Sequence, residues 1–153
     1  MKKIFLLLSI ILLVSCSSDD DSNIDTNDDN PIVNQYEDDI ASIAGNFYVI
    51  SQLTVSGENK TMEFSDYTFN YKADGSLVAR VNLLNASGVY NYIGKTSQES
   101  NELLDISFVN ANPSEPFMDL NERWTIESAT VDQVSLRFSN GVDINKMLVF
   151  TKS

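Results

Sequence analysis

Few side chains of this chain could do chemistry. Its 153 residues include no histidine, which excludes histidine-assisted nucleophiles, histidine-held zinc and histidine-ligated haem. Two groups of carboxylates are the remaining candidates for hydrolysis: Glu58, Glu63 and Asp66, and Asp119 with Glu122. A glycosidase needs two carboxyl groups that face each other across a cleft, and in so small a domain a solvated rim is the simpler interpretation. We therefore predict a protein that is not an enzyme and that uses no metal and no cofactor.

Aromatic side chains are the better candidates for binding. The predicted ligand-binding set is Phe47, Phe64, Tyr67, Phe69, Tyr71, Tyr90, Tyr92 and Trp124. One interpretation is a pocket lined with rings and hydroxyls, and the other is that the rings fill a narrow barrel as its core. Trp124, beside Arg123, could instead be a stacking platform for a sugar or a ring. Small inward residues at an open end would favour an internal ligand, whereas an exposed aromatic patch together with a filled interior would favour docking at the surface.

The elements that must position these rings are strands, because apolar and polar residues alternate with period two from Gly45 onward. Turn chemistry separates the runs at 56–59, 73–76, 85–88 and 139–141. We expect a bulge or bend near Ser65 and Asp66, a long loop over 110–116, and a short helix over 38–44. The predicted strands are 46–55, 61–72, 76–84, 88–95, 102–109, 122–129, 133–139 and 145–152.

This pattern predicts an all-β fold. Eight strands joined mostly by short hairpins can close into an antiparallel up-and-down barrel, which leaves no sheet edge exposed. The same strands also allow a two-sheet sandwich. An outer-membrane barrel is disfavoured, because the second face carries Lys72, Arg80, Asp105 and Arg137 where such a barrel needs a continuous apolar band.

The first 15 residues have the pattern of a secretory signal peptide. Lys2 and Lys3 precede an apolar run over 4–14 that is too short to cross a bilayer as a helix. The following Leu-Val-Ser-Cys16 resembles the lipobox of bacterial lipoproteins. That resemblance implies cleavage before Cys16, a diacylglycerol on its thiol, and a fatty acid such as palmitate on the new amino terminus. Several acyl chains would hold the protein on a membrane almost permanently.

The segment after Cys16 is strongly acidic. Residues 17–40 hold nine acids and no base, a composition typical of disorder. The sequence Ser18-Asp-Asp-Asp21 resembles the export signal of Bacteroidetes lipoproteins, which implies an outer-membrane protein that faces the cell exterior. The net charge of −12 opposes binding to nucleic acid and leaves membrane attachment to the lipid. We divide the chain into a signal peptide at 1–15, a lipidated cysteine with a disordered tether at 16–40, and a barrel domain at 41–153.

The barrel domain itself resembles a known family. Gly45-Asn46-Phe47 is similar to the Gly-x-Trp start of lipocalin-like domains, with phenylalanine in place of tryptophan. The segments 67–76, 124–126, 134–136 and 148–150 are similar to small lipocalin-like lipoproteins of Bacteroidetes. The resemblance implies a small barrel that can hold a ligand cavity at one end. We therefore predict a surface-tethered lipoprotein that binds a small apolar or amphipathic ligand in its barrel. The alternative is a non-enzymatic module that docks a protein or a glycan through loops such as 110–121.

Overall fold

The computed structural model describes residues 32–108 and 116–153, and the structural statements below concern these residues. The predicted signal peptide, Cys16, the export motif and most of the predicted tether lie outside them, as does most of the predicted 110–116 loop. Within these two ranges, no helix is long and apolar enough to cross a membrane.

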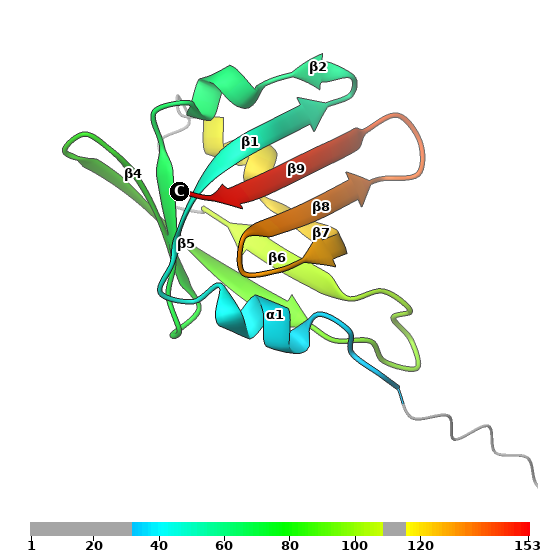
Figure 1. Ribbon diagram of the computed structural model, residues 1–153. Helices are drawn as coiled ribbons and strands as arrows, with labels where there is room; N and C mark the ends of the chain where they lie inside the picture. The colour runs from blue at the N-terminus through cyan, green and yellow to red at the C-terminus, as the bar shows by residue number, and fades with distance from the viewer. Residues whose placement is uncertain (1–31, 109–115) are drawn as a thin grey trace, which may run out of the picture. The chain divides into compact units, whose positions relative to one another are not determined.

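Eight antiparallel strands close into an up-and-down barrel, which confirms the predicted fold class (Figure 1). Each strand pairs with the next one in the barrel, and β1 pairs with β9 from Tyr48↔Lys152 to Val55↔Lys146, which closes the sheet. A further two-residue strand, β2, pairs with the end of β1. The strands are β1 (Phe47–Val55), β2 (Glu58–Asn59), β3 (Thr68–Tyr71), β4 (Ser76–Val81), β5 (Leu84–Ile93), β6 (Leu103–Ser107), β7 (Glu122–Ala129), β8 (Gln133–Ser139) and β9 (Asn145–Lys152).

The second predicted strand, 61–72, is wrong in its first half. A 3₁₀ helix, η1 (Thr61–Phe64), takes the place of its first residues, and β3 begins only at Thr68. The turn between them falls where the sequence predicted a bend. Phe64 reaches the core from the helix rather than from a strand, which explains why the period-two pattern breaks at this point.

The predicted turn at 85–88 is also wrong. The β4–β5 hairpin turns at Asn82 and Leu83, with Val81 opposite Leu84, and 85–88 lie inside β5. Asn82 has a φ of 50°, a conformation that asparagine tolerates better than most residues. Gly88 marks close packing instead of a turn, because a Cβ there would lie 2.6 Å from the Ser107 carbonyl oxygen.

The packed domain extends toward the N-terminus beyond the predicted boundary at residue 41. Helix α1 (Glu37–Ser42) lies across one end of the barrel (Figure 1), and Ile40 and Ile43 are buried there. Tyr36 packs against the core, and its hydroxyl donates a hydrogen bond to the Glu127 carbonyl oxygen at 2.8 Å. Residues 35–40, which the composition assigned to the disordered tether, are therefore part of the fold.

The barrel has two ends, since its strands run alternately up and down. We call one the α1 end: it carries α1 and the connections 72–75, 94–102 and 130–132. We call the other the loop end: it carries the connections 56–67, 82–83 and 140–144 and a second 3₁₀ helix, η2 (Pro116–Leu120). The chain enters the described domain at the α1 end.

Candidate functional site

Most of the predicted ring set comes together inside the barrel. Phe64, Phe69, Tyr71 and Trp124 are buried, and the others except Phe47 are partly buried against the same core. Phe47 is 44% exposed and lies on the outer face of β1. The predicted stacking platform at Trp124 is wrong, because the indole is fully buried and its Nε1–H donates a hydrogen bond to the Leu120 carbonyl oxygen at 2.9 Å.

The interior rings pack on one another. The ring centroid of Phe69 lies 5.2 Å from that of Phe150 and 6.4 Å from that of Phe108. Phe117 of η2, which the sequence analysis did not single out, lies 4.7 Å from Phe108. Edge-to-face and tilted contacts of this kind stabilise a core beyond simple burial. The rings therefore support the core interpretation more than that of a lined pocket.

Tyr71 differs from its neighbours in the polar part of its side chain. Its ring makes edge contacts with Tyr48 and Tyr90, at centroid distances of 5.5 and 4.9 Å. Its hydroxyl is buried and has no hydrogen-bond partner among the described residues. Burial, with smaller contributions from Tyr48 and Tyr90, raises the pKa of Tyr71 well above its ordinary value.

A buried carboxylate closes the α1 end. Glu102 is 2% exposed, and its two oxygens accept the backbone N–H groups of Gln35 and Tyr36 at 2.6 and 2.7 Å. The Tyr92 hydroxyl donates to the same carboxylate at 2.9 Å, and the Lys95 ammonium lies at 3.5 Å. The segment that leads into α1 is therefore fixed to the barrel wall through Glu102.

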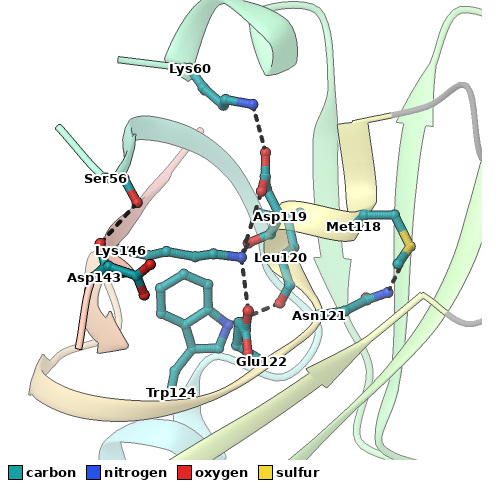
Figure 2. A network of polar contacts seen from close by, with 10 residues as sticks. All are labelled: Ser56, Lys60, Met118, Asp119, Leu120, Asn121, Glu122, Trp124, Asp143 and Lys146. Atoms are coloured by element: carbon teal, nitrogen blue, oxygen red, sulfur yellow. Dashed lines mark hydrogen bonds and ion pairs between the residues drawn. The ribbon is translucent and has the colours of Figure 1, made fainter. Parts of the chain in front are cut away.

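A buried ammonium group organises the loop end (Figure 2). The side chain of Lys146 points inward from the start of β9 and is 7% exposed. Its Nζ donates to Glu122 Oε1 at 2.8 Å and to the Asp119 carbonyl oxygen at 3.3 Å. Lys60 Nζ meets the other face of Asp119, at 3.0 Å from Oδ2. Asp119 and Glu122, one of the two predicted carboxylate groups, are therefore engaged in ion pairs.

The ion pairs hold η1 and η2 together at the loop end. Lys60 lies just before η1, and Asp119 lies within η2. In addition, Phe117 of η2 packs against Phe64 and Tyr67, at centroid distances of 5.8 and 5.3 Å. The two short helices thus form a fixed platform across the barrel end.

The loop end also carries a set of exposed apolar side chains, which we call the apolar tips. They project from η1, from the β4–β5 hairpin, from η2 and from the β8–β9 turn. The apolar tips are Met62, Leu83, Leu84, Met118, Val142 and Ile144. The second predicted carboxylate group, Glu58, Glu63 and Asp66, lies exposed among the same connections. No group of three or more metal-ligating side chains occurs in the described part of the chain.

Comparisons with known proteins found one similar solved structure and no matching family model or curated protein. Among solved structures, it is similar to a DUF4847 family protein from Bacteroides vulgatus ATCC 8482, with a TM-score of 0.47 and 14% sequence identity. That match covers 71% of this chain and 93% of the other. At this score and identity, the likeness carries no argument about function.

Proposed function

We propose that this protein is a lipid-anchored, non-enzymatic interaction module that docks a protein partner through its loop end. The observation that carries the proposal is the tip of the β4–β5 hairpin. Leu83 is 97% exposed there, and the neighbouring Leu84 is 67% exposed. Turns are normally built from glycine, asparagine, aspartate, serine and proline, so two exposed leucines are not explained by the needs of the turn.

The geometry of the hairpin supports the same conclusion. Its tip extends past both neighbouring strands: the β3–β4 pairing stops at Arg80, and the β5–β6 pairing begins only at Val89. The projection is visible at the left of Figure 1. Among the described residues, the leucines at the tip therefore gain little burial from the fold. Exposed leucine and methionine together are typical of protein-binding surfaces.

The charge at the loop end favours a basic partner surface. Glu58, Glu63, Asp66 and Asp143 lie exposed in its connections. Its two lysines, Lys60 and Lys146, are already paired with Asp119 and Glu122, so the four exposed acids outnumber the exposed Arg80 near the end of β4. An apolar contact region with an acidic rim complements a partner whose own rim is basic, and it repels an anionic membrane surface.

An internal ligand has less support. The predicted pocket residues contact one another across the barrel, as described above. In addition, α1 covers one end of the interior and η2 covers the other, with buried residues in both. A carrier would need one of these ends to open.

The proposed anchor is Cys16, on the evidence of the lipobox and export motifs in the sequence. The domain is entered from its α1 end, and the loop end is the opposite one. Docking at the loop end would therefore take place on the side away from the attachment point of the tether. Absence of enzymatic activity is part of the proposal and rests on the lack of histidine and on the ion-paired state of Asp119 and Glu122.

Site-specific photo-crosslinking in cells that make the full chain tests the docking proposal. A photoreactive amino acid replaces Leu83, Leu84 or Met118 at the loop end. Matched control positions are Val89 on the barrel wall and Val131 at the α1 end, which are also exposed apolar residues. We expect one discrete protein adduct from the loop-end positions and none from the controls.

Three outcomes would overturn the proposal: equal adducts from all positions, adducts to lipid alone, or no adduct from any loop-end position. A second variant tests whether the leucines matter for binding. Replacing Leu83 and Leu84 with serine should abolish the adduct formed from Met118 while changing the free energy of unfolding by less than about 0.5 kcal/mol. An unchanged Met118 adduct would contradict a role for the hairpin.

A further inference from the structure

We infer that a groove on the outer face of β1, β8 and β9 is a binding site for a neutral saccharide unit. The groove lies outside the barrel, near the loop end, and has a volume of about 370 Å³. That volume falls within the range of small-molecule sites in proteins. It is lined by Gln52, Thr54, Gly57, Arg137, Asn145, Lys146 and Met147.

The floor of the groove is a row of three neighbouring side chains. Thr54 of β1 lies opposite Met147 of β9, and Met147 lies opposite Arg137 of β8. All three side chains point outward, since the inward positions of β9 are the alternate ones that face the core. Met147 and the Thr54 methyl group therefore provide an apolar patch that can contact the C–H face of a sugar ring.

The walls are held in place by hydrogen bonds. The Ser56 N–H donates to the Asn145 carbonyl oxygen at 2.8 Å, which ties the β1–β2 turn to the start of β9. Gly57, in this turn, has a φ of +87°, and a Cβ there would meet nothing within 4 Å. The wall at this point is bare backbone beside open space.

Three polar side chains that line the groove have no hydrogen-bond partner among the described residues: those of Gln52, Thr54 and Asn145. Each amide offers both a donor and an acceptor, and the threonine hydroxyl offers the same. Arg137 is held by Glu127, with Nε 2.5 Å from Oε1. Its other guanidinium N–H groups add donors of fixed orientation.

The charges of the groove select against ionic ligands. The Arg137 guanidinium is already neutralised by Glu127. The Lys146 side chain turns inward and its ammonium pairs with Asp119 and Glu122 (Figure 2), so its charge is not offered to a ligand in the groove. The lining residues offer no unpaired cation for an acid and no carboxylate for a base. Paired donors and acceptors around an apolar floor fit the vicinal hydroxyl groups of a neutral sugar.

Saturation-transfer NMR on the full chain in detergent micelles tests this inference, with glucose, galactose, mannose and N-acetylglucosamine as probes. We expect saturable binding of at least one sugar. Arg137→Ala and Gln52→Ala should each weaken it by about tenfold, the loss expected for one hydrogen bond to a charged or well-placed polar group. Arg123→Ala is the matched control, because Arg123 is similarly exposed and pairs with Asp105 at 2.9 Å on the outer face of another strand.

The inference is overturned if no sugar gives a saturable signal at tens of millimolar, or if Arg123→Ala weakens binding as much as Arg137→Ala does. A clear preference for galacturonate over galactose would also overturn it, because a second carboxylate at Arg137 would lie close to the Glu127 carboxylate and be repelled by it. Replacing Leu83 and Leu84 with serine should leave sugar binding unchanged, so this site and the proposed protein-docking end can fail independently.

Discussion

Replacing Glu102 with glutamine should weaken the fold by removing one acceptor from a fully occupied buried site. One carboxylate oxygen accepts from the Gln35 N–H, with Lys95 nearby, and the other accepts from the Tyr36 N–H and the Tyr92 hydroxyl. A glutamine has only one carbonyl oxygen. In either orientation, its NH₂ group faces one of the two backbone N–H donors, which loses its acceptor.

The expected cost follows from this geometry. A buried backbone donor without a partner costs about 1–3 kcal/mol, and the remaining hydrogen bonds lose their charge assistance, about 1 kcal/mol more. We therefore expect Glu102→Gln to lower the free energy of unfolding by about 2–4 kcal/mol. Glu58→Gln is the matched control. Glu58 is exposed on β2, and its substitution should cost less than about 0.5 kcal/mol.

The same site predicts a pH dependence. Burial alone would raise the pKa of Glu102, but the hydrogen bonds from Gln35, Tyr36 and Tyr92, together with the Lys95 charge, lower the pKa below its ordinary value of 4.5. The Glu102 carboxyl group therefore binds its proton more weakly in the folded protein than in the unfolded chain. The contribution of Glu102 to stability is therefore fully present above about pH 4.5 and is lost as the pH falls through the lower pKa of the folded state.

Urea denaturation followed by circular dichroism, repeated from pH 7 down to pH 3, measures both effects. Amide hydrogen exchange then shows whether protection is lost first at Gln35 and Tyr36. The reasoning is refuted if Glu102→Gln costs no more than Glu58→Gln. It is also refuted if the stability difference between the wild-type chain and Glu102→Gln grows, instead of shrinking, as the pH is lowered.

Three further substitutions test the packing inside the barrel. Lys146→Met should cost about 2–4 kcal/mol because it leaves the Glu122 carboxylate without its partner at 2.8 Å; adding Glu122→Gln should recover part of this loss in a double-mutant cycle by urea denaturation. Gly88→Ala should cost about 1–3 kcal/mol because its Cβ would lie 2.6 Å from the Ser107 carbonyl oxygen, and the urea midpoint should fall at constant slope. Tyr71→Phe should be neutral or stabilising by up to about 1 kcal/mol, since the hydroxyl is buried without a partner among the described residues. A lower melting temperature for Tyr71→Phe in thermal denaturation would contradict this and would support an internal ligand bound to the hydroxyl.

The barrel was predictable because most strands bury only one face. Along β8, for example, Val134 and Leu136 are buried, whereas Gln133 and Arg137 are exposed. The same alternation of apolar and polar residues can be seen directly in the sequence. Errors arose where one residue type has two roles. Gly88 suggested a turn, but glycine is needed there because Phe108 and the Ser107 carbonyl oxygen approach closely. The real turn at 82–83 contains leucine, which is rare in turns.

The candidate sites were much less predictable, because they depend on contacts between distant segments. Lys146 appears in the sequence as an ordinary polar residue at the start of a strand, and only the closed barrel brings it beside Glu122. Glu102 meets Gln35 and Tyr36 across 67 and 66 positions of the chain. The composition of residues 17–40 assigned Gln35 and Tyr36 to the tether, because composition contains no information about a partner as distant in the sequence as Glu102.

Whether such a barrel carries a ligand inside depends on its small inward residues. An eight-stranded barrel is only wide enough for side chains or one small ligand, so a cavity needs small side chains beside one another. Ala79, Ala86 and Gly88 meet this condition on β4 and β5, where Ala79 lies opposite Ala86. The Phe108 ring occupies the space beside Gly88, with its Cδ1 2.8 Å from where a Cβ on Gly88 would lie. Gly88 thus accommodates a ring of the protein itself. A carrier would have to displace this ring and also break the contacts of Glu102 or Lys146, whereas binding at the outer surface requires neither change.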